Sequence, residues 1–160
     1  MRALLLFSLA SVAVATPSAA GAQARTDETV LLSEDPRGRA MQEQLGFADA
    51  VIAGDTIYLS GIVVGRRPGE SDLRPAYERA YRAIGRILER AGASHADIVD
   101  VTSYHTDITA EIEAMSEVQR RFLGSPPPAW TAIQVVRLLP EGGVTEIKIV
   151  ARRPAAAARN

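Results

Sequence analysis

The stretch RAYRAIGRILERAGASHADIVDVTSYHTDI, from Arg79 to Ile108, decides the fold because it predicts a helix that leads directly into a strand. An apolar stripe at helical spacing begins three residues before this stretch, runs through its first half, and consists of Ala76, Ala80, Ile84, Ile87, Leu88 and Ala91. Gly92 ends the helix, and β-branched and aromatic residues from Ile98 to about Thr106 favour a strand. Ser71 or Asp72 can cap the start of the helix.

Two short apolar runs before this helix predict a β-hairpin. They cover residues 47–52 and 56–60, and Ala53-Gly54-Asp55 between them has the composition of a tight turn. We expect Gly61 to end the second strand and residues 65–70 to form an exposed loop.

A second helix and two more strands complete the predicted domain. Asp107 or Thr109 can cap the helix, and its inner face holds Ile112, Met115, Val118, Gln119 and Phe122. Gly124 and three prolines end it, and strands follow at 130–136 and 144–151. The order β-β-α-β-α-β-β predicts an α+β fold in which two helices cover one face of a mixed sheet.

The predicted strand at 130–136 carries apolar residues on both of its faces. A two-layer domain of this size would leave one of these faces in water. Burying that face against other copies of the chain removes the problem. We therefore expect a symmetric oligomer with any pocket at the seam between subunits.

The first 24 residues are typical of a secretory signal peptide. Arg2 is a short positive region, residues 3–15 are apolar, and Ala22-Gln23-Ala24 has the small residues of a cleavage site. We predict a cut after Ala24, a periplasmic or secreted location, and no membrane attachment of the mature chain. The expected organisation is a signal peptide (1–24), a flexible N-terminal arm (25–45), the folded domain (46–153) and a disordered tail (154–160).

Composition argues against several classes of function. The formal net charge is −1, so bulk electrostatics does not favour a nucleic-acid partner. There is no cysteine, which removes thiol nucleophiles and thiolate metal sites. His95 and His105 stand apart and have no metal-ligand spacing with acidic residues, so we expect neither a metal nor a cofactor.

Four blocks in order resemble the RidA family, also called YjgF/YER057c/UK114. They are GDTIYLSG (54–61), the stretch quoted first, PPAWTAIQVVRL (127–138) and VTEIKIVARR (144–153). The resemblance covers residues 46–153. It implies a chorismate-mutase-like fold, a homotrimer and ligand clefts between subunits. It also implies a small-molecule substrate, because the enzymatic members hydrolyse enamines and imines to ammonia and a 2-oxo acid.

The resemblance assigns roles to several residues of this chain. Ser60 and Gly61 match a hydroxyl and a backbone N–H at the cleft, and Thr131 replaces a serine with another hydroxyl. Glu146 matches the acid that positions the attacking water, and is therefore the candidate catalytic residue.

This chain departs from the family pattern at the substrate anchor. Enzymatic members hold the substrate carboxylate with an arginine, and that position is Trp130 here. An indole has no positive charge and only one N–H donor. Ala132 replaces a cysteine, Phe47 lacks the hydroxyl of the family's aromatic residue, and Met115 stands where the family has an asparagine.

Each candidate also has a plainer interpretation. Trp130 is either a platform on which a flat or cationic ligand stacks, or a side chain that fills the cleft or packs against the next subunit. Glu146 can simply pair with Lys148, and Ser60 can be an ordinary turn residue. The arginines at 66–67 can supply a positive charge to a ligand, but a solvated loop is the favoured interpretation.

The sequence thus predicts an exported RidA-like protein that binds a small metabolite in inter-subunit clefts and has substrate-binding residues Phe47, Ser60, Gly61, Trp130 and Thr131. Catalysis is left open, and an active protein would be a hydrolase acting on the C–N bond of an enamine or imine without a carboxylate. The alternative is a binding or interaction protein without chemistry. A standard RidA deaminase and a ribonuclease are less favoured.

Overall fold

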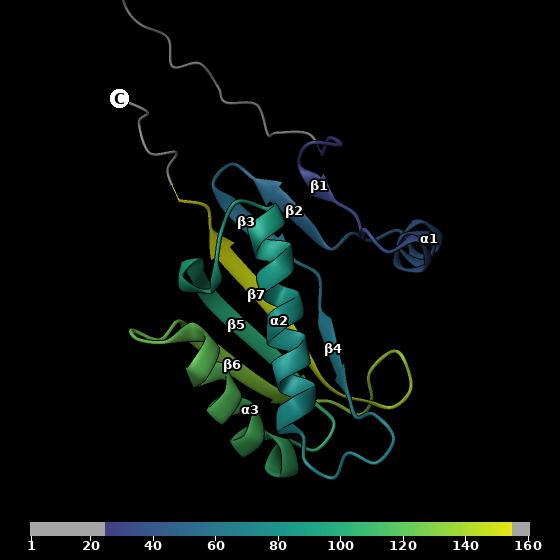
Figure 1. The fold of residues 1–160 in the computed structure, drawn as a ribbon, viewed down its shortest axis with the longest axis vertical. Coiled ribbons are helices and arrows are strands. Elements are labelled where there is room, and N and C mark those ends of the chain that lie inside the picture. Colours follow the sequence, from purple (N-terminus) through teal and green to yellow (C-terminus); the bar gives the residue numbers. More distant parts are fainter. Residues whose placement is uncertain (1–24, 155–160) are drawn as a thin grey trace, which may run out of the picture.

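The computed structural model of the protein describes residues 25–154, so the expected signal peptide and nearly all of the expected tail lie outside it. Figure 1 shows the arrangement of the described part. Its elements, in chain order, are β1 (Val30–Leu31), α1 (Pro36–Leu45), β2 (Ala50–Ala53), β3 (Thr56–Leu59), β4 (Ile62–Gly65), α2 (Arg74–Arg90), a 3-10 turn (His95–Asp97), β5 (Ile98–His105), α3 (Ile108–Leu123), β6 (Ala129–Gln134) and β7 (Gly143–Arg152).

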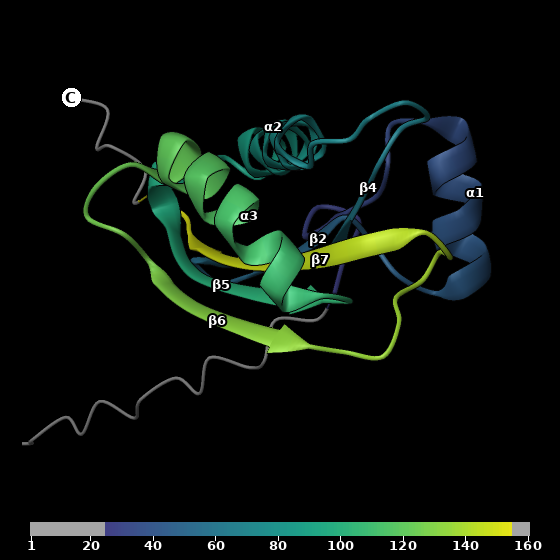
Figure 2. The ribbon, with the colours of Figure 1, turned by 90° about the horizontal axis from the view of Figure 1, so that it is seen from below.

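All seven strands form one mixed sheet in the order β1-β2-β3-β7-β5-β6, and β4 also pairs with β7. β5 and β6 run parallel, and the other pairs are antiparallel. α2 and α3 lie side by side on one face of the sheet (Figure 2). The predicted α+β architecture, with two helices on one face of a mixed sheet, is confirmed.

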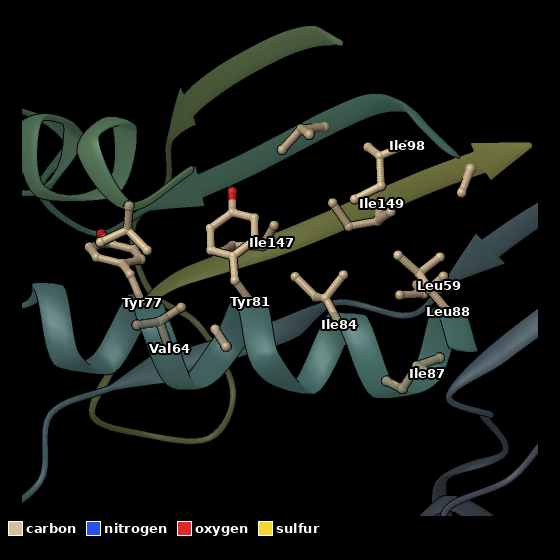
Figure 3. Packing of buried hydrophobic residues seen from close by; sticks show 14 of the residues in the cluster. Leu59, Val64, Tyr77, Tyr81, Ile84, Ile87, Leu88, Ile98, Ile147 and Ile149 are labelled. Carbon is tan, nitrogen blue, oxygen red and sulfur yellow. The ribbon is translucent and has the colours of Figure 1, made fainter. Parts of the chain in front are cut away.

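The core lies between these helices and the sheet. The predicted stripe of α2 is buried, and Tyr77 and Tyr81 extend it. Figure 3 shows Tyr77 and Tyr81 projecting from α2 toward β7, with Tyr81 beside Ile147. Burial of these side chains is the main source of stability for such a domain. No helix within residues 25–154 is long and apolar enough to cross a membrane.

Within the predicted domain (46–153), one strand is missing from the sequence prediction, namely β4. Gly61 interrupts the chain between β3 and β4 but does not end the sheet, because residues 62–65 pair with residues 143–147 of β7. β7 is long enough to pair with β3 through its C-terminal part and with β4 through its N-terminal part. The break at residues 60–61 therefore lies beside the middle of β7.

The segment at 25–45, expected as a flexible arm, instead contains β1 and α1. Its anchor is the buried Gln42, whose Oε1 accepts the backbone N–H of Ser33 (2.7 Å) and whose Nε2 donates to Asp49 Oδ1 (2.6 Å). Arg90 of α2 pairs with the same Asp49 at 2.9 Å. The contact between Asp49 and Arg90 joins residues 41 positions apart, which local composition does not reveal. Figure 2 shows α1 apart from the layer of α2 and α3.

Candidate functional site

Glu146 and Gly61 are in direct contact at the break between β3 and β4. Glu146 lies on β7 and pairs with Val63 of β4 and Tyr104 of β5. A Cβ added at Gly61 would lie 1.7 Å from Glu146 Oε1, so the carboxylate group occupies the space of a side chain at that position. The candidate acid and the candidate backbone donor are therefore neighbours within one chain.

Lys148 does not pair with Glu146, although both side chains lie on the same face of β7. Its Nζ donates to the carbonyl of Leu59 at 2.7 Å. Within residues 25–154, Glu146 forms no ion pair. Ser60, which precedes Gly61, is half-buried, and its backbone N–H donates to the backbone carbonyl of Asp49 at 2.9 Å.

Thr131 lies on the same sheet face as Glu146, which is the face that α2 and α3 leave uncovered. The register pairs Thr131 of β6 with Thr102 of β5, and Thr102 with Lys148. Paired residues project from the same side of a sheet. The uncovered face thus carries Glu146, Lys148 and Thr131 together.

Trp130 lies on the opposite face of the sheet. It pairs with the buried Val101, and its Nε1 donates to Ser103 Oγ at 3.0 Å on the side that the helices cover. Its side chain is still 36% exposed because β6 is an edge strand. Within one protomer, Trp130 and Glu146 therefore do not line a common pocket.

The remaining candidates are at the periphery. Phe47 is exposed just before β2. Arg66 donates from Nη1 to the carbonyls of Glu70 and Ser71, so its guanidinium is engaged within its own loop. Met115, at the position of the family's asparagine, is fully buried in the core.

The uncovered sheet face exposes large apolar side chains in the single chain. Tyr58 is 46% exposed, Val99 44% and Ile133 43%. Apolar groups gathered on one face of a sheet are typical of an interface. A neighbouring copy seated there would bring its own side chains close to Glu146 and Thr131.

The sequence analysis missed a buried polar cluster behind Trp130. Ser103, His105 and Glu111 are buried, and each is hydrogen-bonded to the next. The available signal was the alternation in β5, because Ser103 and His105 share the helix-facing phase of Val101. A polar residue at a buried strand position needs a hydrogen-bond partner.

Within the described residues, no group of three His, Cys, Asp or Glu side chains is arranged to hold a metal ion. The polar atoms of the buried cluster bond to one another instead. The uncovered face offers a carboxylate, a hydroxyl and an ammonium, and the indole of Trp130 lies on the other face.

The chain is similar to one protein family along most of its length. A family model described as Endoribonuclease L-PSP matches residues 38–153. The RutC family protein YjgH of Escherichia coli K12 is 35% identical over 123 residues, which are 74% of this chain and 92% of that protein.

Solved structures have the same fold. Rv2704 of Mycobacterium tuberculosis, described as a member of the YjgF/YER057c/UK114 family, superposes with a TM-score of 0.66 and 27% identity over 78% of this chain and 98% of that one. RidA of an Antarctic Psychrobacter gives a TM-score of 0.60 and 27% identity, with coverages of 81% and 98%.

Proposed function

The chain belongs to the Endoribonuclease L-PSP family, also called the YjgF/YER057c/UK114 or RidA family. From this premise we propose a function in which, unlike in the enzymatic members, the substrate is not an acid. The protein binds a small neutral or cationic metabolite in clefts between its copies and hydrolyses the C=N bond of an imine that lacks a carboxylate.

One observation carries the proposal: the single N–H of Trp130, which the resemblance puts at the position of the anchoring arginine, is already donated to Ser103. A substrate carboxylate beside this indole would have neither a counter-charge nor a free donor there. Leaving such a charge desolvated and unpaired costs several kcal/mol, on the order of 3–5. A neutral or cationic substrate avoids this penalty.

Glu146 is suited to act on water. Its carboxylate lies over Gly61 in the space that a Cβ would fill, so the absence of that Cβ lets the acid sit at the break between β3 and β4. As water attacks the imine carbon, Glu146 accepts one of its protons and passes that proton to the imine nitrogen, which regenerates the carboxylate. The resulting carbinolamine expels ammonia and leaves a carbonyl compound, so imine and water are converted to carbonyl and ammonia.

The proposal requires a second copy of the chain, because Trp130 and Glu146 of one protomer lie on opposite faces of the sheet. We propose a homotrimer in which the uncovered face is buried and residues from neighbouring copies meet. The exposed Tyr58, Val99 and Ile133 support burial of this face. Light scattering on the purified protein measures the number of copies directly, and a monomer would contradict the proposed cleft.

The test compares two imines that differ in one carboxylate. An amine oxidase produces the imine of phenethylamine, and an L-amino-acid oxidase produces the corresponding imino acid from phenylalanine. We expect accelerated ammonia release from the first and little from the second. Glu146→Gln, which keeps the size of the side chain but is a poor base, should reduce the acceleration by at least a hundredfold.

Two results would overturn the proposal. Comparable acceleration of the imino acid would mean that another group binds its carboxylate, and Lys148 would be the first residue to substitute. Binding of the imine without turnover, unchanged by Glu146→Gln, would favour a pure binding protein. We propose no action on RNA, because the chain has a net charge of −1 and shows no basic stripe in its sequence.

A further inference from the structure

A continuous chain of hydrogen bonds runs from the exposed edge of the sheet into the core. The indole Nε1 of Trp130 lies 3.0 Å from Ser103 Oγ, which lies 2.8 Å from His105 Nε2. The other ring nitrogen, Nδ1, lies 2.9 Å from Glu111 Oε2. Ser103 and His105 are fully buried, and Glu111 nearly so. Trp130 is the one member of this chain that reaches solvent.

Glu111 sets the donor-to-acceptor direction of these hydrogen bonds. Its Oε1 accepts the backbone N–H of Asp107 and the hydroxyl of Thr106, both at 3.0 Å. Its Oε2 accepts the hydroxyl of Thr145 at 3.0 Å, and Tyr77 donates to that hydroxyl at 2.7 Å. Both oxygens of Glu111 thus act as acceptors, and the arrangement consistent with this has the Nδ1 of the neighbouring imidazole donating to Oε2.

The next bonds follow from counting hydrogens. If His105 donated from Nε2 as well, Ser103 Oγ would receive two donors, and its own hydrogen would lack an acceptor in a buried position. The satisfied arrangement has the Ser103 hydroxyl donating to His105 Nε2 while it accepts the Trp130 N–H. Every hydrogen bond then points toward Glu111. The indole is the outermost donor of this chain.

This arrangement fixes both the orientation of the indole and what it offers to a ligand. The ring has two rotatable bonds, and the bond to Ser103 holds its polar edge inward. What remains for the solvent side is the π surface and the carbon edge. Such a surface attracts cations and flat apolar groups, and it offers no donor to an acid.

We propose that Ser103 and His105 are positioning residues that lock Trp130, so that the site selects a flat or cationic group and discriminates against an acidic one. The selectivity rests on the proposed function, which places Trp130 at the ligand. The fixed orientation of Trp130 is independent of the proposed function, because it follows from the hydrogen bonds within one protomer.

The first experiment measures the lock without any ligand. Trp130 is the only tryptophan of the chain, so one indole N–H cross-peak in a nitrogen–proton NMR spectrum reports on it alone. We expect Ser103→Ala to shift this peak and to accelerate indole hydrogen exchange at least tenfold. Ser103→Thr, which keeps a hydroxyl, should restore slow exchange.

Two further variants distinguish the loss of the hydrogen bond to Trp130 from a general loss of stability of the domain. Ser116→Ala removes a hydroxyl that bonds only the backbone of its own helix α3, and it should leave the indole signal unchanged. His105→Gln removes the ring that accepts from Ser103 and should accelerate indole exchange even if Ser103→Ala folds poorly. An indole that exchanges as slowly in Ser103→Ala and His105→Gln as in the wild type overturns the lock.

The second experiment measures selectivity with benzyltrimethylammonium and benzoate, which are flat probes of opposite charge. The wild-type trimer should bind the ammonium at least tenfold more tightly than benzoate, and Ser103→Ala should weaken ammonium binding at least threefold. Equal binding of both probes overturns the inferred selectivity, even if the imine of phenethylamine is still hydrolysed. If the lock and the selectivity are observed but no imine is consumed, the proposed hydrolysis fails and this inference stands.

Discussion

The carboxylate of Glu146 lies across the Cα of Gly61, so that the side chain of one residue requires the absence of a side chain at the other. A Cβ at position 61 would lie 1.7 Å from Oε1, 2.5 Å from Cδ and 2.7 Å from Cγ of Glu146. The backbone of Gly61 does not have a positive φ, so alanine is compatible with its conformation. The glycine is therefore needed for the space occupied by Glu146.

We predict that Gly61→Ala displaces Glu146 and lowers imine hydrolysis at least tenfold while unfolding stability changes by less than about 1 kcal/mol. The stability effect is small because the displaced group is the flexible end of a side chain. The matched control is Gly65→Ala, whose added Cβ meets its nearest neighbour at 3.6 Å. Equal activity of both variants would show that the position of Glu146 does not matter for turnover.

We predict that Trp130→Arg gives the protein activity toward the imino acid of phenylalanine. A charge-assisted pair with a carboxylate contributes about 1.5–3 kcal/mol, which corresponds to a gain of about tenfold or more in kcat/KM. Trp130→Gln is the control, because it removes the indole without adding a charge. A similar gain in both variants would mean that the indole only obstructs the cleft.

We predict that the protein loses stability as the pH rises from 10 to 12. Burial raises the pKa of Tyr77 to about 12 and raises the pKa of Tyr81 further. Above pH 10 the unfolded chain loses protons that the folded chain retains, so the free energy of unfolding falls through this window. The contribution is fully present below pH 10.

Thermal unfolding measured at intervals from pH 9 to 12 tests this prediction. Tyr77→Phe and Tyr81→Phe should each lose less stability over the window than the wild type, relative to their own values at pH 9. Parallel curves for all three proteins would mean that other groups cause the alkaline loss.

We predict that the mature protein begins at Arg25 and is found in the periplasm or medium. The measurement is the intact mass of the protein from a bacterial host that expresses the full sequence. Ala24→Asp should block cleavage, since the residue before the cut must be small. A full-length cytoplasmic product from the unaltered sequence would contradict export.

Much of the fold follows from local patterns. The period of α2 and the Asp107 cap of α3, which accepts the Ala110 N–H, depend on residues close in sequence. β4 was missed because Gly61 looks like the end of a strand. The residues of β7 that pair with β4 lie some eighty positions further along the chain. α1 was missed although local signals mark it, since Asp35 caps its start, a proline follows, and Gly46 ends it with a positive φ. Only its link through Asp49 to Arg90, 41 positions away, depends on the tertiary structure.

The candidate site also has features that follow from the sequence and features that depend on the tertiary structure. By itself the sequence determined which chemical groups are present, above all an indole at the position where the resemblance to the family leads one to expect an arginine, because side-chain identity needs no coordinates. Only the tertiary structure decided which groups meet: Glu146 beside Gly61 on one face, and Trp130 bonded to Ser103 on the other. These contacts depend on strand register and sheet face, and a shift of one residue in either strand would exchange the two sides.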